Sequence, residues 1–247
     1  ITCDISGYGD AGAKAKLKAY DFLVQAEAGL LSVSGVPDAY GRIGVSICDI
    51  GAGMHALIAI QQALALREMT GEGSALHVSL FESAFDWMAV PLLHEMYGNG
   101  APKRVGLKHP TIAPYGGFET QDGHTVIISI QNNREFARLC EVVLGNAALA
   151  SDVRFAENNA RVTHREMLDG LVAAAFGLRT RAEIETLLTQ AEIAYGGINS
   201  VADVATHPQA RTWPQAVNGK TVQMMAPAFQ ASWQENKFEE CPALGAD

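Results

Sequence analysis

The segment 51–69 constrains the fold more than any other, because it carries the clearest helical pattern in the chain. Its large apolar residues recur at the spacing of one helix face: Met54, Leu57, Ile58 and Leu64. Thr70-Gly71 follows, and a glycine commonly ends a helix. We therefore predict a long helix over 51–69 with an apolar stripe.

Strands and shorter helices are predicted on both sides of this helix. Residues 1–6 and 75–80 have the composition or alternation of short strands. Residues 20–31 and 81–97 have helical spacing. This mixture of strands and helices predicts an α/β first part of the chain.

The pattern changes after the polar segment 98–110, which we interpret as a linker or a substrate-facing loop. Two strands, 115–120 and 124–130, flank the hairpin signal Asp122-Gly123. Helices are predicted from Asn132 or Asn133 to about residue 144, over 163–176, and from the capping box Thr180–Glu183 to about residue 190, with a strand over 220–225. We expect a smaller α+β domain over 106–215, after a large domain that includes 1–105. Residues 216–247 are expected to return toward the large domain.

Composition and charge exclude several classes of function. The chain is 48% apolar and 18% charged, which is typical of a folded globular protein. Its 18 Lys and Arg against 27 Asp and Glu give a net charge of −9, so nucleic acid is not expected as the main partner. No apolar run reaches the roughly 18 residues that span a bilayer, so no membrane partner is expected.

The cysteines predict a reducing environment rather than a metal site. Cys3, Cys48, Cys140 and Cys241 lie far apart and form no CxxC pair. We expect reduced thiols, no metal, and a cytoplasmic protein. Because the chain opens on a strand at Ile1 without an initiator Met, we also expect a piece of a longer polypeptide.

Two short motifs could carry chemistry near the amino terminus. Gly7-x-Gly9-x-x-Gly12 follows a strand, as in dinucleotide-binding proteins, but the next segment lacks the apolar face of a packed helix. A glycine turn at a strand end is therefore the preferred interpretation. The neighbouring Lys14, Lys16 and Lys18 form either a solvated face or a phosphate-binding cluster.

Asp49 stands just before the predicted long helix, so two roles are open to it. A helix amino terminus carries free amide donors and partial positive charge, which suit a capping carboxylate or a nucleophile. Gly51 and Gly53 would let a ligand approach the backbone. Position alone favours the cap. Among the histidines, none forms an HExxH pair, and His109 is the best functional candidate because it lies in the polar loop.

Five motifs in the same order resemble the family III CoA-transferases. They are Lys18-x-Tyr20-Asp21-x-x-x-Gln25-x-x-x-Gly29, Asp49-x-x-x-Gly53, Gly71-x-Gly73 with Ser79-x-x-Glu82, His109-Pro110-x-x-x-Pro114-Tyr115, and Gly196-Gly197 with His207-Pro208. The superfamily includes formyl-CoA transferase, carnitine CoA-transferase and α-methylacyl-CoA racemase. The resemblance implies a Rossmann-like large domain with a smaller α+β domain, and a homodimer of interlocked chains.

The resemblance also implies roles for single residues. Asp49 falls on the catalytic aspartate, which attacks an acyl-CoA thioester and passes through an acyl-aspartyl anhydride and an aspartyl-CoA thioester. Lys18, Tyr20, Gly51 and Gly53 would lie at the CoA site, and Gly98, Gly100 and His109 in a substrate loop. Coenzyme A thioesters would be substrates, with carboxylic acids as acceptors and no permanently bound cofactor.

Tyr20 separates the alternatives on this fold. Racemases of the superfamily have a catalytic histidine here, so a tyrosine favours a transferase over an acyl-CoA racemase or epimerase. CoA transfer between two carboxyls of one dicarboxylate and a non-catalytic CoA-binding protein also stay open. The loop expected of a formyl-CoA transferase is not obvious, so the resemblance favours short dicarboxylates such as mesaconate, itaconate, citramalate or succinate.

Overall fold

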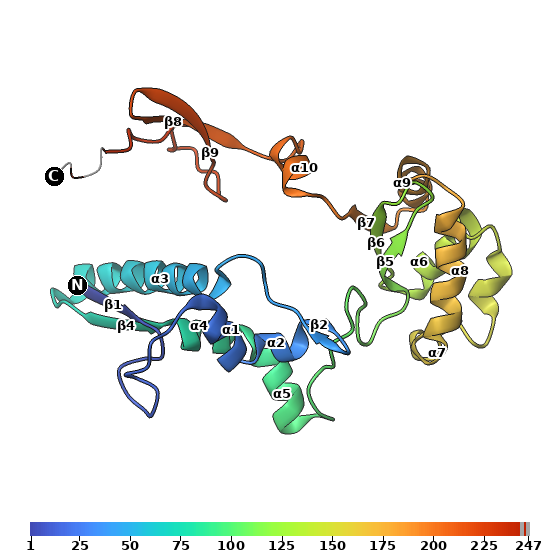
Figure 1. The fold of residues 1–247 in the computed structure, drawn as a ribbon, viewed down its shortest axis with the longest axis horizontal. Coiled ribbons are helices and arrows are strands. Elements are labelled where there is room, and N and C mark those ends of the chain that lie inside the picture. Colours follow the sequence, from blue (N-terminus) through green and yellow to red (C-terminus); the bar gives the residue numbers. More distant parts are fainter. Residues whose placement is uncertain (243–244, 246–247) are drawn as a thin grey trace. The chain divides into compact units, whose positions relative to one another are not determined.

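A computed structural model describes residues 1–242 and 245 and shows a mixed α/β fold with several small sheets (Figure 1). The chain divides into two compact units, residues 1–195 and residues 196–247. Within the first unit, two separate apolar cores lie on either side of the loop 98–110 along the chain. The predicted domain ranges stay predictions, and residues 243–244 and 246–247 of the range 216–247 lie outside the described residues.

The first core contains a parallel strand pair and the long helix of its crossover. Strand β1 (Thr2–Ser6) pairs with β4 (Ala75–Ser79), with Thr2 opposite Ala75. Helix α3 (Ile47–Thr70) contacts both strands. The α/β class is thus confirmed, whereas the Rossmann-like sheet stays a prediction, because two strands form this described sheet.

Helix α3 begins four residues earlier and ends one residue later than predicted. Gly71 has φ 76° and donates its N–H to the Arg67 carbonyl, which confirms it as the end of the helix. The buried residues of α3 are small: Cys48, Gly51, Ala52, Ala56 and Ala63. The predicted stripe of larger residues is instead exposed, with Met54, Leu57 and Ile58 each more than half accessible.

Helix α3 corrects the expectation that no segment could span a membrane. Among the described residues it is long and apolar enough to do so by length and composition. Such a match is weak support for a membrane span, because core helices of soluble proteins meet the same criterion.

Two predicted helices are each divided in two. Residues 20–31 form α1 (Asp21–Glu27) and α2 (Leu30–Val33), because Gly29 between them has φ 85°. Residues 81–97 form α4 (Leu80–Trp87) and α5 (Ala89–Tyr97). Pro91 has no N–H to bond the Trp87 carbonyl four residues back, which accounts for the break at Met88. A short hairpin, β2 (Gly35–Val36) and β3 (Ala39–Tyr40), precedes α3.

The second core lies between a small three-stranded sheet and a group of helices. Strands β5 (Tyr115–Glu119) and β6 (Thr125–Ser129) form the predicted hairpin, with Gly123 at φ 77°, and β7 (Ala194–Gly197) is the third strand. The helices are α6 (Asn133–Arg138), a π-helical turn (Leu139–Val143), a 3-10 turn (Ala147–Ser151), α7 (Asn158–Thr163), α8 (Arg165–Gly177) and α9 (Arg181–Gln190). Asn132 caps α6, and Thr180 and Glu183 form the predicted capping box of α9.

The second unit contains a short helix and a hairpin. Helix α10 (Val201–Ala205) is followed by β8 (Thr212–Val217) and β9 (Lys220–Met225). The strand over 220–225 is confirmed, and its partner β8 was not predicted. Asn218 and Gly219 both have positive φ, as the tight two-residue turn between paired strands requires.

Candidate active site

Asp49 is the third residue of α3, and its side chain is exposed. Its carboxylate makes no hydrogen bond or ion pair within residues 1–242 and 245. The helix cap is Ser46, which itself makes no side-chain capping bond. The interpretation of Asp49 as the cap is therefore wrong: the helix starts before it and leaves its carboxylate unpartnered.

The capping carboxylate comes instead from Asp21, at the start of α1. Its Oδ2 accepts hydrogen bonds from the backbone N–H of Cys48 at 2.7 Å and, more weakly, of Asp49 at 3.4 Å. Asp21 is 8% exposed although it is an acidic residue. The amide donors at the amino terminus of α3 are thus directed to a buried residue 27 positions earlier in the chain.

Gln25, one helical turn after Asp21, completes this network. It is fully buried, and its Nε2 donates to Asp21 Oδ1 at 2.6 Å and to the Ile43 carbonyl at 3.2 Å. Its Oε1 accepts from the Ile43 N–H at 3.0 Å. Sequence reasoning used Asp21 and Gln25 only as parts of a motif. The available signal was their spacing of i, i+4, which places two polar residues on one side of a predicted helix.

Cys48 immediately precedes Asp49, donates its N–H to Asp21, and is fully buried. Burial, followed by the nearby charges of Asp21 and Asp49, raises the pKa of its thiol to about 11. Cys48 therefore stays protonated at neutral pH and is not a competing nucleophile.

The two glycines after Asp49 have different surroundings. A Cβ on Gly51 would lie 2.4 Å from Cη2 of Trp87, so Gly51 allows the helix to pack on that ring. A Cβ on Gly53 would meet nothing within 4 Å. Gly53 is four residues after Asp49, on the same side of the helix, so it leaves open space beside the carboxylate.

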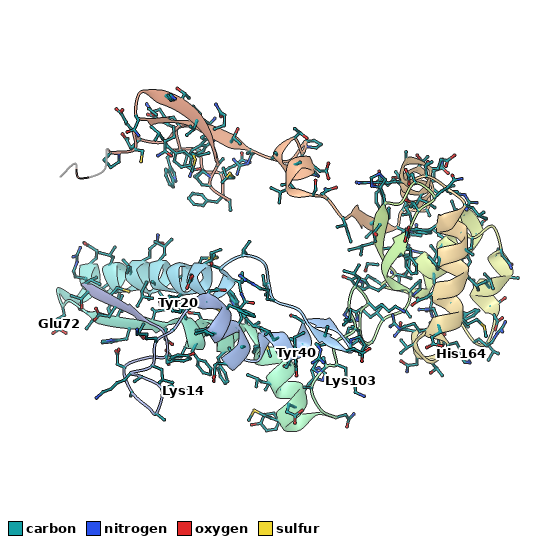
Figure 2. The ribbon with its side chains drawn as sticks, in the orientation of Figure 1. Lys14, Tyr20, Tyr40, Glu72, Lys103 and His164 are labelled. Carbon is teal, nitrogen blue, oxygen red and sulfur yellow. The ribbon has the colours of Figure 1, made fainter. Side chains whose placement is uncertain are left out.

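Lys18 and Tyr20 lie in an exposed stretch before α1. Figure 2 labels Tyr20. Tyr20 is 71% exposed and immediately precedes Asp21. Lys18 has no ion pair within the described part of the chain, whereas Lys14 pairs with Glu27. Residues 10–20 form no helix after the glycine turn, which argues against the dinucleotide-binding interpretation.

The predicted substrate loop is anchored by contacts of its own. Gly98 follows α5, and Gly100 has φ 97°. The His109 ring stacks on Tyr115 with centroids 5.0 Å apart, and its Nδ1 accepts from the Thr111 N–H at 3.2 Å.

Arg104 ties the same loop to the segment that precedes α3. It donates to the carbonyls of Val36 at 3.1 Å and Pro37 at 2.8 Å, and its guanidinium lies 4.2 Å from the ring centre of Tyr40. Lys103 and Arg104 also line a cavity of about 480 Å³ with Ser32 and Pro37. Figure 2 labels Lys103 and Tyr40 in this region.

The structure connects the predicted site residues only in part. Asp21, which follows Tyr20 in the chain, accepts a weak hydrogen bond from the Asp49 N–H. Within the described residues, no hydrogen bond or ion pair joins Asp49 to Lys18, Gly98, Gly100 or His109. The same residues contain no group of three or more His, Cys, Asp or Glu side chains that could hold a metal ion.

Comparison with known proteins gives consistent results. Residues 1–247 match CoA-transferase family III. A succinate–glutarate CoA-transferase of Agrobacterium fabrum is 32% identical over 212 residues, which cover 85% of this chain and 52% of that protein. An acetyl-CoA:oxalate CoA-transferase of Acetobacter aceti is 30% identical over 241 residues, covering 97% and 61%.

A solved structure agrees with these relatives. The crystal structure of a CAIB/BAIF family protein from Brucella suis has a TM-score of 0.81 and 34% identity, and covers 95% of this chain. The match extends over 62% of that protein. The chain thus spans between about half and two thirds of the length of the three proteins.

Proposed function

The chain belongs to CoA-transferase family III, and from this premise we propose that it transfers coenzyme A from an acyl-CoA thioester to a carboxylic acid. The names of two relatives include succinate, glutarate and oxalate. We therefore propose a short dicarboxylate as donor or acceptor acid. No permanently bound cofactor is required, because the thioester itself supplies the activated acyl group.

The exposed carboxylate of Asp49 is the observation that carries this proposal. A nucleophile must be accessible and free of competing partners, and Asp49 meets both conditions. The open space at Gly53 supports the approach of a thioester along the same side of α3. Lys18 and Tyr20 would contact the CoA part of the substrate.

The first half of the reaction transfers CoA to the protein. An Asp49 oxygen attacks the thioester carbonyl, the C–S bond breaks, and an acyl-aspartyl anhydride and a CoA thiolate result. The thiolate then attacks the Asp49 carbonyl carbon and displaces the donor acid as its carboxylate. Asp49 now carries CoA as a thioester.

The second half repeats these steps in reverse with the acceptor acid. The acceptor carboxylate attacks the aspartyl-CoA carbonyl and releases the thiolate, which leaves a mixed anhydride. The thiolate attacks the acceptor side of this anhydride, forms the new acyl-CoA and restores the Asp49 carboxylate. Backbone N–H groups are the expected donors to the tetrahedral oxyanions.

Mass spectrometry of an acid-quenched reaction tests the proposal. Incubation with succinyl-CoA, glutaryl-CoA or acetyl-CoA should add CoA or an acyl group to the peptide that contains Asp49. Asp49→Ala should form no adduct and keep its affinity for CoA. Asp38→Asn, which changes another exposed carboxylate, serves as the matched control and should form the adduct normally.

Two results would contradict the proposal. A chain that binds CoA but forms no adduct on Asp49 would refute the assignment of Asp49 as the nucleophile. Exchange of the α-proton of the acyl group with solvent, without an adduct, would indicate the racemase alternative. A homodimer and a cytoplasmic location stay predictions, which sedimentation and cell fractionation can test.

A further inference from the structure

Two buried polar side chains hydrogen-bond the backbone of the segment that carries Asp49. Asp21 and Gln25 are buried on α1, the helix that supplies Val24 to the core of Val24, Ala28, Leu30, Cys48, Ala84 and Met88. A charge or an amide in such surroundings is costly unless its hydrogen bonds are made. Here the polar atoms of both side chains hydrogen-bond to the backbone of residues 43–49 and to each other.

The bonds fall on both sides of Ser46, where the chain enters α3. Gln25 holds the N–H and the carbonyl of Ile43 before this point. Asp21 holds the N–H of Cys48 and, more weakly, of Asp49 after it. Ser46 provides no side-chain cap, and Asp21 and Gln25 supply side-chain hydrogen bonds to the backbone before and after it.

The same bonds decide which groups interact with the Asp49 carboxylate. Amide donors in the first turn of a helix attract nearby carboxylates. In this helix the Cys48 N–H, and more weakly the Asp49 N–H, is directed to Asp21. The carboxylate of Asp49 is exposed and has no hydrogen bond among the described residues.

We propose that Asp21 and Gln25 are positioning residues that fix residues 43–49 and aim an unpartnered Asp49 carboxylate at the thioester. The proposal rests on the proposed function, in which Asp49 is the nucleophile. Both residues act through the backbone and touch no substrate. Their chemistry is specific: one carboxylate accepts from Cys48 and Gln25 together, and one amide both donates to and accepts from Ile43.

Two variants and one control test this role. Asp21→Asn leaves a single acceptor oxygen, which cannot serve both Cys48 and Gln25. Gln25→Met keeps the length of the side chain but removes its bonds to Ile43. Ser79→Ala is the matched control, because Ser79 is a buried cap of α4 whose side chain makes no hydrogen bond to residues 43–49 in the described part of the chain.

The first readout separates positioning from general stability. With saturating succinyl-CoA, the rate of adduct formation on Asp49 should fall about 100-fold in Asp21→Asn and Gln25→Met, since small misplacements of a reacting group have effects of this size. The CoA dissociation constant should change less than about twofold, because neither side chain is a proposed CoA contact and neither hydrogen-bonds the side chain of Lys18 or Tyr20 among the described residues. Ser79→Ala should lower the melting temperature and keep the wild-type rate.

The second readout does not depend on activity. Amide hydrogen exchange over residues 43–50 should become faster in both variants and stay unchanged in Ser79→Ala. If Asp21→Asn does not fold, the Gln25→Met variant alone tests the positioning role. A wild-type rate in the variants would overturn the proposal whatever the exchange shows, and so would a loss of CoA affinity as large as the loss of rate.

The two proposals can fail separately. If the wild-type chain binds CoA but forms no adduct, the proposed function fails. Exchange over residues 43–50 then shows whether Asp21 and Gln25 still hold this segment. If the wild type forms the adduct and the variants form it equally fast, only the positioning role is refuted.

Discussion

Neighbouring residues of the same type have different roles in this site because their surroundings differ. Gly51 faces the edge of Trp87, whereas Gly53, half a turn away, faces open space beside Asp49. Lys14 pairs with Glu27, whereas Lys18 has no ion pair in the described part of the chain. Residue type alone predicts neither difference. Each difference can be measured with a matched pair of substitutions.

The two glycines give the first prediction. Gly51→Ala should be less stable than Gly53→Ala by about 1–3 kcal/mol, because the new methyl group forces Trp87 out of its position. The gain in helix propensity, about 1 kcal/mol at either site, cancels in this comparison. Urea denaturation of both variants measures the difference. Equal stabilities would mean that the indole ring moves away at no cost.

The lysines give the second prediction. Lys18→Ala should weaken CoA binding by about 1–2 kcal/mol, as expected for one lost charge-assisted contact with a phosphate. Lys16→Ala, which removes an exposed lysine two residues earlier, is the control and should bind CoA as the wild type does. Isothermal titration calorimetry provides the dissociation constants. Equal affinities for Lys18→Ala and the wild type would mean that Lys18 belongs to a solvated face and does not contact CoA.

At the scale of the element, the ends of helices were predicted best where the ending depends on neighbours in sequence. The Thr180–Glu183 box, the Asn132 cap and the Gly71 stop are all confirmed. The start of α3 was placed too late because the carboxylate that accepts from its first-turn amides, Asp21, is not a neighbour in sequence. The divisions at Gly29 and Met88 show that helical spacing continues across a local break.

The capping box of α9 gives the third prediction. Thr180→Ala removes the acceptor of the Glu183 N–H and should destabilise the protein by about 0.5–2 kcal/mol. Thr186→Ala, in the interior of the same helix, loses only a bond to the Ala182 carbonyl and should change stability by less than about 0.7 kcal/mol. Thermal unfolding compares the two variants. A similar loss in both would show that the cap adds nothing beyond the side chain itself.

At the scale of the whole chain, each apolar core contains one buried cysteine. Cys48 belongs to the core that supports Asp49, and Cys140 belongs to the core of residues 118–193. Burial raises the pKa of each thiol to about 11, so both are largely protonated near neutral pH while the protein is folded. Cys241 is exposed and free. The thiols therefore report separately on the two cores.

Thiol labelling gives the fourth prediction and tests the domain ranges. At pH 8 a maleimide should label Cys241 rapidly, and Cys48 and Cys140 only after unfolding. If 1–105 and 106–215 belong to different domains, Cys48 and Cys140 should become reactive at different urea concentrations. Peptide mapping after short labelling pulses measures both. A single shared midpoint would show that the two cores unfold together.

The sequence alone determined the class of fold, most local elements and the family. Helical spacing, turn glycines and capping boxes act over a few residues, so they can be detected in the chain itself. The order of the motifs indicated the CoA-transferase family, which the comparisons confirm.

Only the tertiary structure decided how Asp49 is presented. It showed that Asp21 rather than Asp49 caps α3, that Gln25 holds Ile43, and that Gly53 rather than Gly51 is open. The physical reason is the range of the interactions. Backbone conformation depends mainly on near neighbours, whereas the partner of a buried polar group is whichever residue the packing of distant segments brings within hydrogen-bonding distance.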